Sequence, residues 1–441
     1  MKIRFCIPLL VLTIVTACKP AHPVGTVTSG EADFSRIVAV TGSNGAGYSD
    51  DALTYSGQKN AFTTLLVQQL ELSGSVNFNQ AFLAENSVGI NLNNQSVFDL
   101  NFRTDCQGAS SLGPVRRATS GDASVLSQIL GIRSNLSVPF MRSVDAVDPN
   151  FGNSSLGAGN FNPFYSRIAS NPSVSTVKGD ATSQLPTFSI ISLGEEDVLR
   201  FAQSGGTKSF TPLAGPSGTG FQVSLEETVN DLTSSGAKGV IQNVPDVLSM
   251  PYFTTIPWDN LVLSADQAAQ LNVFVQPLGI SLSEGRNGFL IEDPSSPSGY
   301  RKMVAGEYVL LSTPLDSVKC FGYGSQLPFK DKHVLTLNEV NQIHSITADY
   351  NQVISTIANQ KGLALADAKS LYERVKSGFT LNGVSISTKF VQGNFFSLDG
   401  RYLCPLGQAL LANEYIKAIN SKYSSSIPLL VPTNYSGVKF P

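Results

Sequence analysis

Charged residues and histidines are both scarce in this sequence. Charged side chains make up 14% of the 441 residues, against about a quarter in a typical globular protein, and the net charge is −3. A nucleic-acid-binding protein presents a basic face, so this balance argues against a nucleic-acid partner. Serine, threonine, asparagine and glycine replace the charges, as is common outside the cytoplasm. Hydrophobic residues reach 42%, which is enough for a sizeable core.

Long hydrophobic runs are absent as well. The longest covers residues 5–15 behind Lys2 and Arg4, which is too short to span a bilayer and suits a secretory signal. It ends in VTAC, where small residues before Cys18 resemble a bacterial lipobox. We expect a signal peptide over 1–17, diacylation of Cys18, which would hold the protein on a membrane, and a flexible tether over 18–32. A free or buried Cys18 in an uncleaved signal is the alternative.

Cysteine is rare, at five residues, and none has the spacing of a metal site. We expect no metal and no cofactor. With Cys18 acylated, Cys106, Cys320 and Cys404 remain in the exported chain, so one disulfide at most is possible. The pairing is open on spacing alone, and our choice is Cys106 with Cys320.

Buried strands and amphipathic helices alternate along the chain. This order predicts an α/β fold with a parallel sheet covered on both faces. The predicted strands cover 37–40, 135–140, 186–194, 239–247 and 363–368. The predicted helices cover 57–72, 195–202, 336–362 and the segment after Pro405. Hairpin signals at EGRNG and SPSG predict a β-rich insertion at about 261–327 in a domain over 33–441.

Several polar or unusual residues follow predicted strands directly. Ser43, Phe140, Glu195 and Glu196 each stand just after a strand candidate. Ligand sites of parallel sheets lie beyond the carboxyl ends of the strands, so we expect these residues to converge. Glu195, Glu196 and Asp197 suit the positive end of a helix dipole better than a cation site, because three consecutive acids do not share a helix face.

The turn after residues 37–40 contains Ser43 among Gly42, Gly45 and Gly47. A phosphate-binding loop does not fit, because no lysine followed by serine or threonine comes after the glycines, and no GxGxxG opens a helix. A nucleophilic serine turn remains, beside the plainer alternative of a glycine-rich surface turn.

The chain here resembles the SGNH/GDSL hydrolase family, in particular a group of bacterial lipoproteins. AVTGSNGAGY (39–48), NLSVPF (135–140), GEEDVL (194–199) and SLDGRYL (397–403) match its four blocks in order. FYSRIASNP, FLIEDPSSPSGYR, SVKCFGYGSQ and LANEYIKAINSKY also resemble the family, so the similarity covers roughly 33–441. It implies a three-layer α/β/α sandwich with a parallel central sheet.

The resemblance also shows which catalytic positions are substituted. Ser43 stands at the nucleophile position and Asp399 at the aspartate position, but Phe140 replaces a glycine, Glu196 replaces an oxyanion-binding asparagine and Tyr402 replaces the histidine. A neutral phenol with a pKa of about 10 is no base near neutral pH. Glu196 places a carboxylate where negative charge should develop. Phe140 is expected to strain its turn.

These substitutions predict a pseudo-hydrolase, a binding or accessory subunit lipid-anchored at the outer membrane. The resemblance makes an outer-membrane protein the expected partner, with a fatty-acid-channel-type barrel as one candidate. One alternative is an active esterase or acyl hydrolase that uses Ser43 with a different base, either His333, His344 or Glu196. His22 lies in the tether. The other alternative is a solitary lipid- or glycan-binding lipoprotein.

Overall fold

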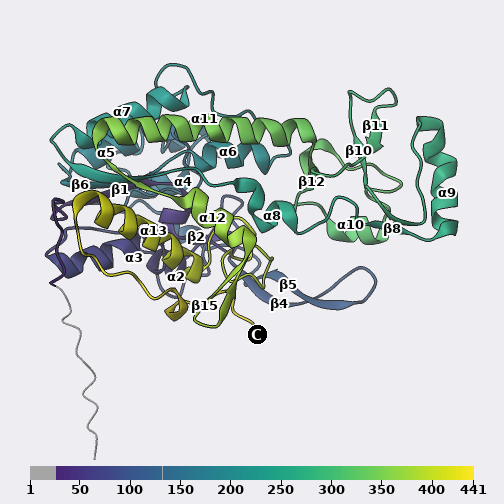
Figure 1. Ribbon diagram of the computed structural model, residues 1–441, viewed down its shortest axis with the longest axis horizontal. Helices are drawn as coiled ribbons and strands as arrows, with labels where there is room; N and C mark the ends of the chain where they lie inside the picture. The colour runs from purple at the N-terminus through teal and green to yellow at the C-terminus, as the bar shows by residue number, and fades with distance from the viewer. Residues whose placement is uncertain (1–25, 132) are drawn as a thin grey trace, which may run out of the picture.

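The structure is a computed structural model that describes residues 26–131 and 133–441 (Figure 1). The signal peptide predicted over 1–17, the lipidated Cys18, His22 and the first part of the tether lie outside the described residues. The rest of the tether is held against the domain, because Glu31 N–H donates to the carbonyl of Tyr423 at 2.8 Å. None of the helices in the described ranges is long and apolar enough to cross a membrane.

A parallel sheet forms the centre of a mixed α/β fold. Its four strands run in the order β1 (Ile37–Thr41), β6 (Phe188–Ser192), β7 (Lys238–Gln242) and β14 (Ala364–Ala366), all parallel. All five residues of β1 are buried, as are the first four of β6. Continuous apolar runs of this kind are typical of strands covered on both faces. The α/β class and the strands predicted at these four places are therefore confirmed.

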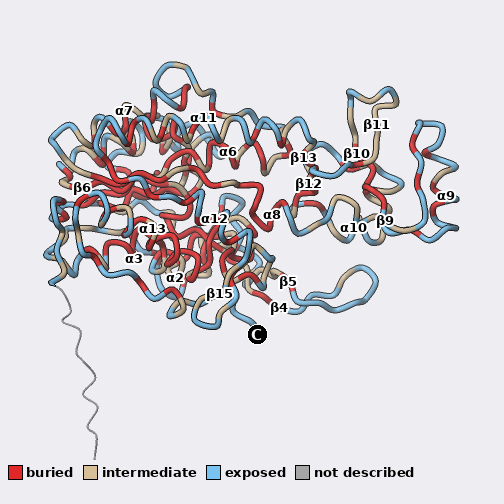
Figure 2. The backbone as a smooth tube through the Cα atoms, viewed as in Figure 1, coloured by how far each residue is buried: buried red, intermediate tan, exposed pale blue. Residues whose placement is uncertain are grey.

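Helices lie on either side of this sheet (Figure 1). Helices α3 (Phe62–Leu70) and α13 (Pro405–Tyr423) lie on one side, and α7 (Phe221–Thr233) and α11 (Leu337–Lys361) on the other. Figure 2 shows the buried residues concentrated along the sheet and the inner faces of the helices. The predicted apolar stripe of α11 is buried: Val340, Ile343, Tyr350, Ile354 and Ile357.

The helix predicted over 57–72 is broken in two. Helix α2 (Tyr55–Lys59) ends before Asn60, and α3 starts at Phe62. The side-chain amide of Asn60 donates to the carbonyl of Ser56 at 2.8 Å, which satisfies the last turn of α2 locally. Gln408 Oε1 accepts from the Phe62 N–H at 3.0 Å and caps the second helix. Two polar side chains thus stabilise a break that apolar periodicity alone does not reveal.

The strand predicted over 135–140 is extended but is not a regular strand. It makes one parallel bridge, between Asn135 and Ala39, and hydrogen bonds to β1 through Leu136 N–H and Val138 N–H. The Asn135 side chain accepts from the Ser137 N–H at 3.1 Å, and Pro139 follows. The segment therefore continues the sheet edge beside β1 without a full ladder.

A projecting lobe corresponds to the predicted insertion. Strand β8 (Leu261–Leu263) pairs with β9 (Gly285–Asn287), and β10 (Leu290–Glu292) pairs with β11 (Tyr300–Lys302). The hairpin at SPSG is confirmed, because it joins β10 to β11. The hairpin at EGRNG is wrong, because those residues form β9 itself. Between β8 and β9 lies an unpredicted helix, α9 (Ala265–Val275), which begins with a capping box at Ser264.

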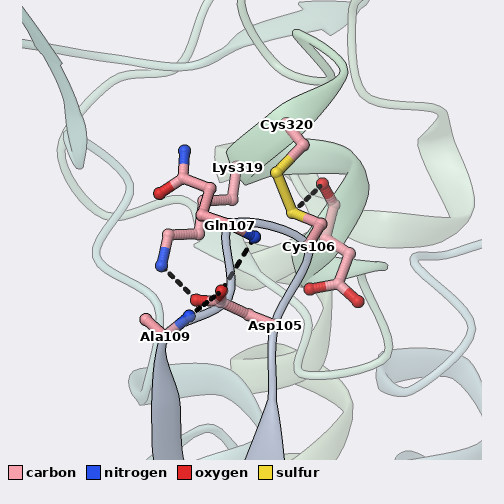
Figure 3. The surroundings of a disulfide bond; sticks show 7 residues. Asp105, Cys106, Gln107, Ala109, Lys319 and Cys320 are labelled. Atoms are coloured by element: carbon pink, nitrogen blue, oxygen red, sulfur yellow. Dashed lines mark hydrogen bonds and ion pairs between the residues drawn. A yellow bond between two sulfur atoms is a disulfide. The ribbon is translucent and has the colours of Figure 1, made fainter.

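A long hairpin, also unpredicted, reaches the lobe. Strands β4 (Phe98–Thr104) and β5 (Ser110–Arg116) form it, and its tip carries Cys106. Cys106 forms a disulfide with Cys320, the last residue of α10 (Leu315–Cys320), with a Cα–Cα distance of 6.5 Å (Figure 3). Beside it Lys319 pairs with Asp105. The predicted pairing is confirmed, and Cys404 is a free, buried thiol.

Candidate functional site

The glycine-rich turn places Ser43 at the carboxyl end of the sheet. Ser43 begins the short helix α1 (Ser43–Ala46) directly after β1, and its side chain is only 1% exposed. A Cβ at Gly45 would lie 1.8 Å from Thr41 Oγ1, so no other residue fits there without a shift. Gly47 has φ +77°, a conformation that favours glycine, and closes the helix. The glycines therefore shape the turn.

Both hydrogen-bonding functions of the Ser43 hydroxyl are used. It donates to Glu196 Oε1 and accepts from the Phe140 N–H at 2.9 Å. Phe140 has φ 66°, in the left-handed region that is rare for a bulky residue, so the strain expected there is confirmed. Its ring packs against Tyr48 with a centroid distance of 4.8 Å. The result is a serine enclosed by its neighbours.

Glu196 lies in the first turn of α6 (Glu195–Ala202), which follows β6. Its carboxylate is 5% exposed and also accepts from the Tyr402 hydroxyl at 3.3 Å. Burial raises the pKa of Glu196 to about 7, although hydrogen bonds from Ser43 and Tyr402 oppose this shift. Because β1 and β6 are neighbours in the sheet, α1 and α6 begin side by side, which brings Ser43 and Glu196 together.

The acids that flank Glu196 bind different partners. Asn44 donates to Glu195 Oε1 at 3.2 Å, whereas Ser143 donates to both oxygens of Asp197 through its N–H and its hydroxyl. The three consecutive carboxylates therefore point apart. Among the residues with a described placement, no group of three or more His, Cys, Asp and Glu could hold a metal ion.

Asp399 and Tyr402 come from the loop before α13. Asp399 Oδ1 accepts from the backbone N–H groups of Arg401 and Tyr402 at 2.7 and 2.9 Å. Its Oδ2 accepts from Asp51 N–H at 3.0 Å and from Ser397 Oγ at 2.9 Å. Tyr402 is completely buried, and burial together with the Glu196 charge raises its pKa well above the ordinary value. Asp399 thus orders the loop, and Tyr402 is a neutral hydrogen-bond donor.

Neither described histidine belongs to this site. His333 packs edge-on against Tyr323 with centroids 5.9 Å apart, and burial lowers its pKa. His344 is exposed on α11. Neither lines the spaces next to Ser43 or Glu196.

A cavity of about 650 Å³ lies beside this cluster. Glu196 and Phe140 form part of its wall, whereas Ser43 borders only a separate void of about 10 Å³. Besides these two, its lining includes Tyr48, Asp51, Arg142, Asp145, Asp148, Phe151, Phe161, Arg200, Gln203, Lys208, Tyr252 and Arg401. The structure therefore brings Ser43, Phe140, Glu196, Asp399 and Tyr402 together, and it places Ser43 outside the cavity.

The sequence reasoning missed an ion-pair network at this cavity. Arg401 Nη2 pairs with Asp51 Oδ1 at 2.9 Å, and Asp51 also pairs with Arg116. Arg401 Nη1 donates to Gln203 Oε1 at 2.7 Å. Arg401 stands inside the SLDGRYL block and Asp51 stands just after the glycine-rich turn, so proximity to these motifs was the available signal.

The Ser43 hydroxyl is engaged on both sides by its neighbours. It donates to the Glu196 carboxylate and accepts from the Phe140 N–H, and Ser43 is only 1% exposed. No family model, curated protein or solved structure matches this chain. The chemistry of the site is therefore the basis for any assignment of function.

Proposed function

We propose that this protein is a catalytically degenerate relative of the SGNH/GDSL hydrolases that acts by binding. The observation that carries the proposal is the enclosure of Ser43, which is 1% exposed and engaged by Glu196 and Phe140. A serine esterase needs a hydroxyl that reaches its substrate. The cavity beside Ser43 supplies space for a ligand, but the serine does not line it.

The substituted positions support the same proposal chemically. An ester carbonyl gains negative charge during attack, and the loss of one donor to that charge costs about 10²–10³ in rate. Glu196, partly ionised at neutral pH, opposes that charge. Tyr402 stays protonated and gives its hydrogen to Glu196, so it does not accept the proton of Ser43. The two carboxylate oxygens of Asp399 accept hydrogen bonds from four donors, none of which is a histidine or another base.

The proposal includes the layered architecture of the domain. The four-stranded parallel sheet with α3 and α13 on one side and α7 and α11 on the other fits a three-layer α/β/α sandwich of SGNH type. The block resemblance over roughly 33–441 supports it independently. The lobe around 261–327 is then an elaboration of that domain.

Location and partner follow from the N-terminal sequence and the resemblance. The lipobox-like VTAC at Cys18 supports a lipid anchor, and we place the protein at the outer membrane. There it serves as an accessory subunit of an outer-membrane protein, with a fatty-acid-channel-type barrel as the leading candidate. Purification from detergent-solubilised membranes tests this directly. Co-purification of a barrel supports an accessory role, and isolation of the protein alone contradicts it.

Ester hydrolysis tests the loss of catalysis. The mature protein, Ser43→Ala and the double variant Glu196→Asn with Tyr402→His are compared on p-nitrophenyl acetate and butyrate. We expect the wild type to equal Ser43→Ala at background. Turnover by the wild type that Ser43→Ala abolishes would instead establish an active esterase. Turnover by the double variant alone would support both the residue assignments and the loss of catalysis.

A further inference from the structure

We infer that the cavity beside Glu196 binds an acidic saccharide, a hydroxylated ring that carries a carboxylate, and that Arg200 receives this carboxylate. The inference rests on the proposed binding role and names the ligand class. At about 650 Å³ the cavity has the size of a small-molecule site, for which about 300–1,000 Å³ is usual. One or two sugar rings fit such a volume.

Aromatic rings supply one part of the wall. Phe140, Phe151 and Phe161 are half-buried and line the cavity, and Tyr252 belongs to the same lining. Aromatic faces pack well against the C–H faces of sugar rings, since both are flat and apolar. Rings that remain half-buried in the absence of a ligand have surface left for this contact.

Amide and carboxylate side chains that can bind sugar hydroxyls form another part of the cavity wall. The amide nitrogen of Gln203 and the side chain of Asn93 have no hydrogen-bond partner within residues 26–131 and 133–441. Asp148 accepts from the Asn150 N–H at 2.8 Å and makes no ion pair there. Amides and a carboxylate with spare capacity match ring hydroxyls, which both donate and accept.

Two cations of the lining have no ion-pair partner in the described chain. Asp145 neutralises Arg142 at 2.6 Å, and Asp51 pairs with Arg401, so these four charges are already paired. Arg200 and Lys208 make no side-chain hydrogen bond or ion pair in the described chain. Burial and the nearby Arg142 lower the pKa of Arg200, and the charges of Asp145 and Asp197 oppose this shift. A half-buried guanidinium without a direct hydrogen bond or ion pair favours an anionic partner.

The orientation of Glu196 explains why Arg200 has no direct ion-pair partner in the described chain. The two residues are four positions apart on α6, the spacing at which a glutamate and a following cation usually pair. Glu196 instead turns inward to Ser43 and Tyr402. The substitution that opposes catalysis therefore leaves Arg200 unpaired at the cavity. A ligand carboxylate would supply the pairing that Glu196 does not.

The test compares two sugars that differ in one group. Binding of glucuronate and of glucose to the full mature protein in detergent is measured by calorimetry or by ligand-observed NMR. We expect glucuronate to bind at least about tenfold more tightly, because a hydrogen-bonded charge pair contributes that much or more. Arg200→Gln should remove the preference while weak glucose binding persists. Lys208→Gln, on an exposed side chain, should reduce the preference by a smaller factor.

Arg374→Gln is the matched control, because Arg374 lies on α12 (Ala368–Ser377) and does not line the cavity. Equal affinity for both sugars, or a preference that survives Arg200→Gln, overturns the inference. The ester assay on the same samples separates the two proposals. Absence of sugar preference without turnover overturns the ligand class alone. Ser43-dependent turnover overturns the non-catalytic role and leaves the ligand class standing.

Discussion

The Ser43 hydroxyl donates its hydrogen to the carboxylate of Glu196, 153 positions further along the chain. The bond joins the start of α1 to the start of α6, the two helices that leave the neighbouring strands β1 and β6. A hydroxyl at the carboxyl edge of a parallel sheet is well placed to face a ligand. Here it faces a buried acid that also accepts from Tyr402, so the hydroxyl contributes to the packing of the domain.

The burial of Glu196 predicts an unusual dependence of stability on pH. Its pKa rises from 4.5 to about 7 on folding because burial disfavours the charged form. Between these values the folded state binds more protons than the unfolded state, so the free energy of unfolding falls as pH rises from about 4.5 to 7. This contribution is at most roughly 3–4 kcal/mol, because one pKa unit corresponds to about 1.4 kcal/mol.

Urea unfolding at pH 5, 6, 7 and 8 measures the effect. Glu196→Gln should be less sensitive to pH over this window than the wild type, because a glutamine does not titrate. Glu284→Gln, an exposed position in the lobe, serves as the control and should keep the wild-type slope. An identical pH slope in Glu196→Gln and the wild type would rule out a raised pKa at this position.

The ion pair between Arg401 and Asp51 predicts a second effect on stability. Its side chain is 15% exposed and pairs with Asp51, which is 18% exposed. Removal of one partner from a buried pair costs about 3–5 kcal/mol, but Arg116 still pairs with Asp51. We therefore expect Arg401→Leu to lower the free energy of unfolding by about 2 kcal/mol, below that range.

Arg374→Leu is the matched control for Arg401→Leu. Arg374 also shares its carboxylate, Glu414, with a second cation, Lys417, but it is 46% exposed. Because the Arg374 guanidinium is exposed and Lys417 remains beside Glu414, its removal should cost only about 0–1 kcal/mol. Equal losses in the two arginine variants would show that burial does not strengthen the Arg401 pair.

The sequence predicts those parts of the fold in which a local pattern and the tertiary structure agree. Residues 337–361 show an apolar stripe at helical spacing and a capping box, and α11 has nearly the predicted bounds. Helix α9 has a capping box too, but its sequence is weakly amphipathic and its apolar contacts lie within a small separate cluster. The β4–β5 hairpin is mostly exposed, so it lacks the alternation that marks a half-buried strand.

The candidate site is likewise only partly predictable from the sequence. Its main residues stand in short motifs, and the rule that sites lie at the carboxyl ends of parallel strands brought Ser43, Phe140 and Glu196 together in advance. The sequence does not reveal the hydrogen-bond and ion-pair partners of each side chain. The Asp51–Arg401 pair spans 350 positions, and no local signal connects the two residues. The enclosure of Ser43 likewise depends on the path of the chain around Phe140, which only the folded structure reveals.

The close packing around Gly45 predicts that adding one methyl group there lowers the stability of the fold. A Cβ there would lie 1.8 Å from Thr41 Oγ1, and Thr41 donates to Ser137 Oγ at 2.7 Å. Gly45→Ala must displace Thr41 and break that bond, so we expect a loss of about 1–3 kcal/mol. Thermal or urea unfolding measures it. In a Thr41→Ala background the same substitution should cost less, because the clashing hydroxyl is gone. Equal costs in both backgrounds would contradict this contact.

The disulfide between the β4–β5 hairpin and the lobe predicts a loss of stability when it is removed. Cys106 and Cys320 are 214 positions apart, so their bond closes a long loop and restricts the unfolded chain strongly. We expect Cys106→Ser with Cys320→Ser to lower the free energy of unfolding by about 2–4 kcal/mol. Reductant should destabilise the wild type by a similar amount and leave the double variant unchanged, because Cys404 is buried and unpaired. A wild type that is insensitive to reductant would mean that the Lys319–Asp105 ion pair and neighbouring contacts hold the hairpin tip without the bond.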